Sequence, residues 1–365
     1  MDSSGTLRHT AGALKVTAAD VPGHVNVRSM PGADSTHLLR VIPFRAESAA
    51  RWDSFVATSW NGTLLHSRRY LEYHLDRYQD ESILIEDTDG KLLGVLPAAH
   101  DPQSPGRLIS HPGITYGGLV QAGGLKGERQ VHALAAAFCH YRDRGFKELI
   151  YKATPHIYQR VPSEDDQFAL VRLGAQLDRI DLAAVVDLDG RPPLPKGRRH
   201  ALRKAQKRSI RAVEDAFRVP ELWQIVRENL RTRHCTSPTH SEAEITDLIR
   251  RFPDQIRCVV GLLNEEVVGG VILFEAGPVL VTQYMASTPV GRANAVLDLL
   301  LGSCLQRAHA EAKRYLSLGT SSIADGYLNE GLHHFKGLFG AGGVAHQLFR
   351  IDLYRPMNVC PFSGR

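Results

Sequence analysis

The sequence predicts an α/β protein in which one order of strands and helices occurs twice. Three observations support this prediction: the length of 365 residues, a composition with 43% hydrophobic and 23% charged residues, and a repeated pattern of alternating and helical apolar spacing. The length corresponds to about two domains of ordinary size. The composition excludes a wholly disordered chain, a collagen and a disulfide-rich miniprotein.

The first copy follows a tail over 1–36, which is rich in Ser, Gly, Ala, Thr and His and which we expect to be disordered or loosely packed. Asp89-Gly90 separates two apolar runs and is a hairpin signal. Gly145 stands where glycine commonly ends a helix, and Ser163 with Asp166 resembles a capping box. The expected strands cover 37–44, 82–87, 92–100, 108–120, 148–153 and 177–188, and the expected helices cover 49–60, 67–79, 129–144 and 163–174.

The second copy follows a proline-rich stretch, 191–197, which is the expected linker because proline lacks a backbone donor and favours extended backbone. The predicted domains are therefore 37–190 and 198–355, with a tail over 356–365. The expected elements of the second copy are a basic helix and short strand over 198–214, helices over 220–234, 241–252, 293–313 and 327–339, and strands over 257–263, 267–275, 279–287, 315–319 and 345–353.

Charge, cysteine and hydropathy patterns narrow the class of protein. Eight cations lie between Lys196 and Arg211 without an acid, and the rest of the chain is slightly acidic, which disfavours a general nucleic-acid binder. The five cysteines form no CxxC pair, so neither a zinc site nor a disulfide framework is expected. The longest apolar stretches fall short of the ~18–20 residues that a bilayer crossing needs. The N-terminus lacks a signal-peptide pattern, so we expect a cytoplasmic protein without metal or membrane contact.

Several short segments carry a resemblance to a known family. They are Ser110-His-Pro-Gly-Ile-Thr-Tyr-Gly-Gly118, Lys152-Ala-Thr-Pro-His-Ile-Tyr158, Pro238-Thr-His-Ser-Glu-Ala-Glu-Ile245, Gln283-Tyr284, Tyr327-Leu-Asn-Glu-Gly-Leu332 and Phe335-Lys336. Together with the duplicated order they resemble tandem GNAT-fold (FemABX-like) N-acyltransferases, and in particular bacterial nucleotide-amino-sugar N-acyltransferases. The resemblance covers about residues 37–353. It implies two tandem GNAT-like domains, each a mixed, largely antiparallel sheet flanked by helices, with acyl-CoA as co-substrate.

The family's pyrophosphate loop, Gln/Arg-x-x-Gly-x-Gly/Ala, corresponds here to Thr288-Pro-Val-Gly291-Arg-Ala293, which departs from it at the leading position. A small-residue turn entering a helix presents N–H groups at the positive end of the helix dipole, although an ordinary strand-to-helix turn has the same letters. Gln121–Gly127 holds the same place in the first copy and is interpreted as a relic. The resemblance implies coenzyme A contacts from Met285, Ala286, Thr288, Gly291, Arg292, Ala293 and Asn294.

Acyl transfer to an amine needs a neutral amine, a donor to the oxyanion and a proton source for the departing thiolate. The resemblance implies that a backbone N–H near Met285–Ala286 is the oxyanion donor. His240 in an interhelical loop, Tyr284 on the fourth strand and Glu330 at a helix start are the catalytic candidates. Their structural alternatives are a capping imidazole, a core tyrosine and a first-turn carboxylate. Gln283 is expected on the opposite strand face from Tyr284.

The acceptor is expected in a cleft between the two domains, because such interfaces are favoured ligand sites. Polar and aromatic residues beside glycine-containing turns of the first copy form one expected wall. The candidate substrate-binding residues are His111, Tyr116, Lys152, His156, Tyr158, Arg233, Gln283, Asn329 and Lys336.

The resulting prediction is an acyl-CoA-dependent N-acyltransferase that acts on a nucleotide-linked amino sugar by direct attack, since no cysteine stands beside a histidine in a recognisable nucleophile setting. Patterns of serine hydrolases, zincins, P-loop NTPases and Rossmann dehydrogenases are absent from the sequence. One alternative is a Fem-type ligase that uses aminoacyl-tRNA, which the basic helix favours. A second alternative is a catalytically silent binding module. Homo-oligomerisation is left open.

Overall fold

The computed structural model describes residues 39–357 except 75, 191, 235, 324 and 325. The predicted N-terminal tail, 1–36, lies outside these residues, as does the C-terminal tail apart from 356 and 357. All described residues belong to one compact unit, Thr36–Arg365. The linker predicted at 191–197 lies within this unit, so the division of the chain into two domains at these residues stays a prediction.

The first copy contains a four-stranded antiparallel sheet in the order β1-β2-β3-β6. Its elements are β1 (Leu39–Pro43), β2 (Ile83–Asp87), β3 (Leu92–Leu96) and β6 (Val120–Gln121), with helices α1 (Ala49–Thr58), α2 (Arg68–Leu71), α3 (Glu128–Asp143) and α4 (Asp165–Arg172). The hairpin predicted at Asp89-Gly90 is confirmed. Gly90 has a φ of 79° and Gly145 a φ of 89°, a conformation that glycine adopts without a steric penalty.

A second sheet of ten strands runs through both copies in the order β4-β5-β7-β14-β8-β13-β12-β11-β10-β9. The β5–β7 and β12–β13 pairs are parallel and the other pairs are antiparallel, which confirms the mixed, largely antiparallel prediction. Its strands are β4 (Ala99–His100), β5 (Arg107–Ile109), β7 (Glu148–Lys152), β8 (Gln176–Asp187), β9 (Arg211–Glu214), β10 (Ile256–Leu263), β11 (Glu266–Ala276), β12 (Val279–Ser287), β13 (Tyr315–Thr320) and β14 (Gly342–Asp352).

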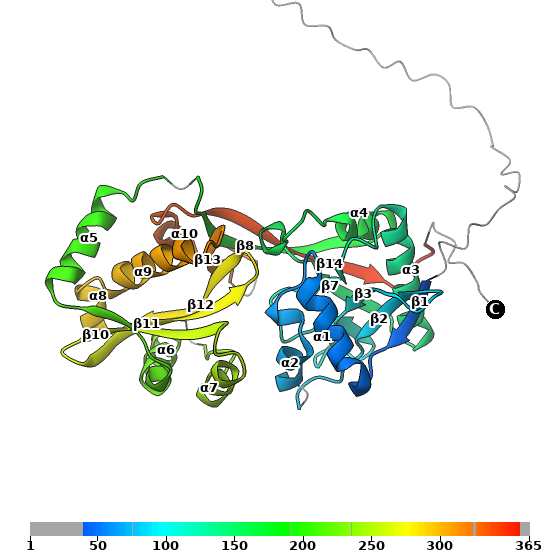
Figure 1. Ribbon diagram of the computed structural model, residues 1–365, viewed down its shortest axis with the longest axis horizontal. Coiled ribbons are helices and arrows are strands. Elements are labelled where there is room, and N and C mark those ends of the chain that lie inside the picture. Colours follow the sequence, from blue (N-terminus) through cyan, green and yellow to red (C-terminus); the bar gives the residue numbers. More distant parts are fainter. Residues whose placement is uncertain (1–38, 75, 191, 235, 324–325, 358–365) are drawn as a thin grey trace, which may run out of the picture. The chain divides into compact units, whose positions relative to one another are not determined.

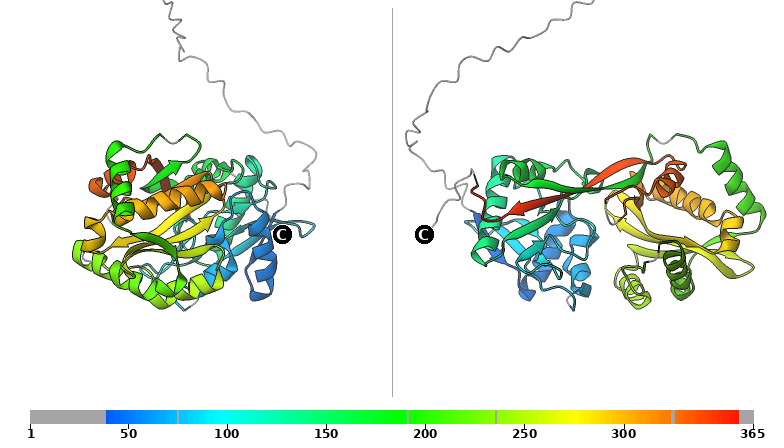
Figure 2. Two further views of the ribbon diagram at one scale, coloured as in Figure 1. Left: turned by 60° about the vertical axis from the view of Figure 1, so that its left-hand side comes forward. Right: turned by 180° about the vertical axis from the view of Figure 1, so that it is seen from behind.

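Strands β8 and β14 join the two copies. β14, the last strand of the chain, pairs with β7 of the first copy through Leu348–Asp352 and with β8 along most of its length. β8, the last strand of the first copy, pairs in turn with β13 of the second copy. Figure 2 shows these two long strands side by side, passing from one lobe to the other. Each copy thus takes a strand from the chain segment that ends the other copy.

Helices cover both faces of the sheet in the second copy. They are α5 (Lys196–Lys207), α6 (Val219–His234), α7 (Glu242–Arg251), α8 (Pro289–Ala293), α9 (Val296–Ala310) and α10 (Glu330–Gly337). Figure 1 shows α6 and α7 on one side of β10–β12, and α5, α9 and α10 on the other. α7 begins with a capping box at Ser241 and Glu244, and its buried residues are Ile245, Leu248 and Ile249.

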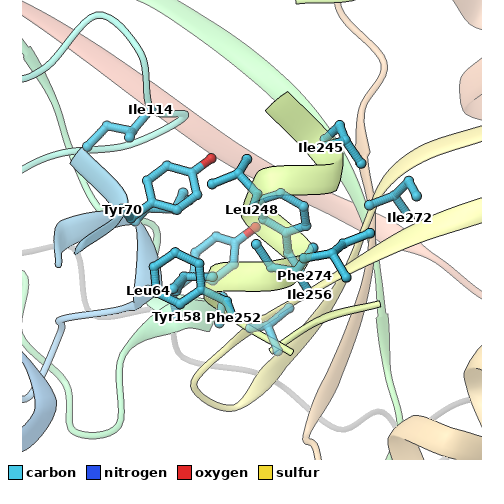
Figure 3. Close-up of a cluster of buried hydrophobic side chains, with 14 of the residues drawn as sticks. Leu64, Tyr70, Ile114, Tyr158, Ile245, Leu248, Phe252, Ile256, Ile272 and Phe274 are labelled. Carbon is cyan, nitrogen blue, oxygen red and sulfur yellow. The ribbon is translucent and has the colours of Figure 1, made fainter. Parts of the chain in front are cut away.

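A hydrophobic core that includes buried residues of α6 and α7 links the two lobes. Tyr70, from α2 of the first copy, packs on Phe252 and Phe274 of the second copy with ring centroids 6.1 and 6.3 Å apart. Figure 3 shows this cluster, in which Leu64 and Ile114 of the first lobe lie with Leu248 and Ile256 of the second. Because these residues are buried together, the two lobes share one hydrophobic core.

Four expectations about the elements are wrong in detail. The helix expected over 67–79 shortens to Arg68–Leu71 with a 3-10 turn at Glu72–His74, and the strand expected over 108–120 reduces to β5 and β6 around an irregular loop. The helix expected over 293–313 corresponds to α9, which begins at Val296 because Ala295 has a φ of 59°, and the loop expected ahead of it forms the short helix α8. Ser163 does not cap α4; its hydroxyl accepts a hydrogen bond from Gln121 Nε2 at 2.6 Å.

Candidate active site

Strands β12 and β13 separate after three residue pairs. They pair in parallel only from Val279–Tyr315 to Val281–Ser317, yet β12 continues to Ser287 and β13 to Thr320. Beyond Val281 the two strands therefore diverge, and two cavities meet at the opening. Thr282, Gln283, Gly319 and Thr320 line both cavities.

The larger cavity has a volume of about 860 Å³ and lies between β12, β13 and the helices α6, α9 and α10. Its lining is mostly apolar, and the first turn of α9 contributes to it. The predicted residues Gln283, Tyr284, Met285, Ala286, Arg292, Asn329 and Lys336 all line it. Residues that were not among the candidate site residues line it as well, among them Arg198, Asn229, Ala295, Asp298, Leu332 and Phe335.

A β-bulge at Gln283 explains why neighbouring residues share this cavity. Ile272 of β11 is opposite Tyr284 and Leu273 is opposite Thr282, so Gln283 has no opposite residue. An extra residue in one strand interrupts the alternation of side chains and increases the local twist. Gln283 and Tyr284 both line the larger cavity, and the expectation that their side chains point to opposite faces stays a prediction.

His240 and Tyr284, both predicted as catalytic, are in contact. The Tyr284 hydroxyl lies 2.7 Å from His240 Nδ1, and His240 Nε2 lies 2.9 Å from the hydroxyl of Tyr73, a residue of the first copy. Burial, followed by the charge of Arg77, lowers the pKa of His240 to about 4. The imidazole is therefore neutral at pH 7. Burial raises the pKa of Tyr284, whose hydroxyl is accordingly protonated.

The two predicted residues at the start of α10 have different settings. The Asn329 side chain caps α10, with Oδ1 accepting from the Leu332 N–H at 3.0 Å. Glu330 is exposed on the first turn.

Lys336 is buried, and its ammonium donates to the carbonyl oxygens of Gly319 and Thr320 at 2.9 and 2.7 Å. Burial lowers its pKa to about 8. Lys336 thus ties α10 to the diverging end of β13.

The predicted pyrophosphate loop forms the short helix α8 ahead of α9. Thr288 caps α8 and accepts from the Gly291 N–H at 3.0 Å. A Cβ added to Gly291 would lie 2.0 Å from the carbonyl oxygen of Val268. Gly291 therefore serves the packing of α8 against β11. Arg292 lines the larger cavity and donates to the carbonyl of Ser287 at 2.6 Å. Ala293 and Asn294 end the turn, where Ala293 accepts a hydrogen bond from Lys204.

The residues predicted on the first copy divide into three groups. Tyr116 and Tyr158 line the smaller cavity with ring centroids 4.3 Å apart. His111 lies in the loop that follows β5, and Lys152, at the end of β7, donates to the carbonyl oxygen of Pro112 in that loop. Burial lowers the pKa of His111 to about 2 and of Lys152 to about 7. His156 is exposed. The side chain of Arg233 lies outside the described residues.

Helix α5 presents most of the basic segment to solvent. Its only buried residue is Ala205, while Arg199, Arg203 and Lys207 are exposed. Arg198 differs, because it pairs with Asp298 at 2.7 Å on the wall of the larger cavity.

Among the described residues, no group of three or more His, Cys, Asp or Glu side chains is arranged to hold a metal ion. Within the same part of the chain, no helix combines the length and the apolar character that crossing a bilayer requires.

The strand divergence and the double set of elements belong to a tandem GNAT fold, which this chain shares with FemX. Residues 196–336 match the acetyltransferase (GNAT) domain family. This match covers most of the second copy and agrees with the GNAT-like fold that the resemblance implied there.

Solved structures with the same fold include FemX, which aligns with 85% of this chain and 96% of its own at 13% identity and a TM-score of 0.63. L-PGS from Bacillus licheniformis aligns with 86% and 93% of the two chains at 14% identity and a TM-score of 0.56. The C-terminal domain of a putative lysylphosphatidylglycerol synthetase from Agrobacterium fabrum aligns with 84% and 91% at 12% identity and a TM-score of 0.54. A comparison with curated proteins found no significant match.

Proposed function

We propose that this chain transfers an acyl group from acyl-CoA to the amine of a nucleotide-linked amino sugar by direct attack. The observation that carries the proposal is the opening between β12 and β13, at which a large cavity and a small cavity meet. A thioester in the large cavity and an amine in the small one would come into contact only at this opening.

The larger cavity fits the donor chemically. Its volume of about 860 Å³ lies in the range of small-molecule sites, roughly 300–1,000 Å³. Ala295, Val296 and Leu297, at the start of α9, line it beside Arg292. Backbone N–H groups at a helix start and a nearby cation suit a diphosphate. Asp298 adds a negative charge there, but its partner Arg198 offsets it.

The reaction needs a proton for the departing thiolate, and Tyr284 supplies it. Tyr284 lines the larger cavity, and its hydroxyl is protonated at neutral pH and held by His240 at 2.7 Å. The amine nitrogen attacks the thioester carbon, the carbon–sulfur bond breaks, and backbone N–H groups near Met285 and Ala286 stabilise the oxyanion.

Direct attack is favoured over an acyl-cysteine intermediate. Of the five cysteines the structure describes three, Cys139, Cys258 and Cys304, and none of these lines either cavity. Burial raises the pKa of Cys258 and Cys304 to about 12. A thiol that is protonated at neutral pH is a poor nucleophile.

The donor assignment is tested by calorimetric titration of the full chain with acetyl-CoA, comparing two substitutions on one helix. Gly331 is exposed and lines the larger cavity, so Gly331→Trp should weaken acetyl-CoA binding at least about tenfold. Gly337, with nothing within 4 Å of an added Cβ, lies outside the cavity lining, and Gly337→Trp should bind normally. Equal affinity of the two variants would refute the assignment of this cavity.

A Fem-type aminoacyl-tRNA-dependent ligase remains the second candidate, because α5 exposes a row of cations and FemX has the same fold. Charge reversal at Arg199, Arg203 and Lys207 separates the two functions. The proposed function expects unchanged acetyl-CoA affinity and no tRNA binding by either protein. Salt-sensitive binding of total aminoacylated tRNA by the native chain, lost in the variant, would instead favour the ligase. Failure to bind either donor would favour a silent module.

A further inference from the structure

The smaller cavity contains a histidine that no sequence pattern singled out. His346 lies on β14, opposite Asp181 of β8, and its side chain lines the smaller cavity. It is 5% exposed, and neither Nδ1 nor Nε2 has a hydrogen-bond partner within the protein. A buried imidazole with both nitrogens unsatisfied is unfavourable in a folded protein unless a bound group or water satisfies it.

The walls around His346 suit a small cationic or amine group. The rings of Tyr116 and Tyr158 lie 6.3 and 6.1 Å from the His346 ring, centroid to centroid. Phenol rings attract an ammonium group, and a neutral imidazole nitrogen accepts a hydrogen bond from an amine. Burial lowers the pKa of His346 to about 4, so the ring is neutral and retains its acceptor at neutral pH.

Size and position restrict what enters this cavity. Its volume is about 120 Å³, far below that of the larger cavity and of ordinary ligand sites. A cavity of this volume has room for a small amine-bearing fragment, and the rest of a larger acceptor would lie outside it. Gln283 and Thr320 are on the boundary of both cavities, so a group beside His346 is on the acceptor side of the β12–β13 opening.

We propose that the smaller cavity is the subsite for the acceptor's primary amine and that His346 is the residue that accepts a hydrogen bond from that amine. The inference rests on the proposed function, because an amine held by His346 reacts only if acyl-CoA binds in the larger cavity. His346 orients the nitrogen lone pair toward the opening. Once the carbon–nitrogen bond has formed and the carbon–sulfur bond has broken, the proton lost from nitrogen passes to the imidazole, and the thiolate takes its proton from Tyr284.

The test follows His346 directly by NMR on the full chain labelled with [13C]histidine, with D-glucosamine as the amine probe. The His346 signal is identified by its disappearance in His346→Gln. We expect a saturable shift of this signal on adding glucosamine, and about tenfold weaker glucosamine binding by His346→Gln, the loss of one buried hydrogen bond. The signal of His140, half-buried on α3 outside both cavities, should not move.

Either of two results would overturn the assignment. The first is a His346 signal that does not change although glucosamine binding to the chain is saturated, and the second is equal glucosamine affinity of the native chain and the His346→Gln variant. His346→Asn is the second variant if His346→Gln does not fold, and circular dichroism reports folding in both. Acetyl-CoA titration of the same samples separates this result from the proposed function. A chain that binds acetyl-CoA without a His346 response refutes only the amine subsite, whereas a His346 response without acetyl-CoA binding refutes only the donor assignment.

Discussion

Single residues in this protein acquire their properties from burial at the junction of the lobes. Tyr73 of the first copy and Tyr284 of the second bond to the two nitrogens of one imidazole, that of His240. The hydrogen bond between Tyr73 and His240 joins residues 167 positions apart. The position of the His240 imidazole, and with it the bond to Tyr284 on the larger cavity, therefore depends on Tyr73 of the first lobe, which does not line that cavity.

Removing the Tyr73 hydroxyl tests this dependence. Tyr73→Phe should lower kcat about tenfold, because His240 loses one of the two bonds that orient it. KM for acetyl-CoA should stay unchanged, since Tyr73 does not line the larger cavity. The measurement is thiol release from acetyl-CoA over a range of pH, with UDP-glucosamine as acceptor. Tyr354→Phe, at an exposed position, is the control, and identical kcat values and pH profiles in both variants would argue against a positioning role for Tyr73.

Buried histidines should make the folded state sensitive to acid. Burial lowers the pKa of His66, which is 0% exposed, from 6.5 to about 3. The unfolded chain binds this proton more readily, so the stabilisation is present above pH 6.5 and is lost as the pH falls toward 3. Between pH 6 and 4, the free energy of unfolding measured with urea should fall less steeply with decreasing pH in His66→Gln than in the native chain. The expected difference is roughly 1 kcal/mol per pH unit. Parallel curves for the two proteins would contradict this prediction.

Secondary-structure elements shape the candidate site through two local irregularities. The bulge at Gln283 interrupts the pairing of β12 with β11 beside the larger cavity, and the left-handed Ala295 separates α8 from α9. Gly291 lies between them, against the backbone of β11. The close contact at Gly291 limits α8 to a small residue there, independently of any ligand.

Substitution of Gly291 should therefore lower the stability of the fold. Gly291→Ala places a Cβ against the Val268 carbonyl and should lower the melting temperature by several degrees, the consequence of at least about 1 kcal/mol of strain. Gly337→Ala, at the open end of α10, should keep or slightly raise it, because alanine favours helix. Differential scanning calorimetry compares the two. A normal melting temperature in Gly291→Ala would mean that α8 shifts without cost.

At the scale of the molecule, the exchange of end strands makes each lobe dependent on the other. β14 lies between β7 and β8, and β8 lies between β14 and β13. A core that includes Tyr70 and Phe274 continues across the junction. The repeated order of elements in the chain is therefore not a pair of independently complete sheets.

Fragments provide the test of this dependence. Residues 198–355 contain the predicted second domain but lack β8, so β13 and β14 lose their shared neighbour. We expect this fragment to aggregate or to lack cooperative unfolding, whereas a fragment over 36–357 should unfold in one cooperative transition by circular dichroism. Cooperative unfolding of 198–355 alone would show that the exchanged strand is dispensable.

Local patterns in the sequence determined the order and type of the elements, the Asp89-Gly90 hairpin and the candidates His240 and Tyr284, because spacing, turn residues and caps act over a few neighbouring positions. The tertiary structure alone decided three further features: which sheet receives β14, the bulge at Gln283, and the placement of Tyr73 and His346. These features arise from contacts between residues far apart in the chain. The local spacing of apolar residues does not depend on such contacts. The sequence of β14 therefore predicts only a final strand of the second copy.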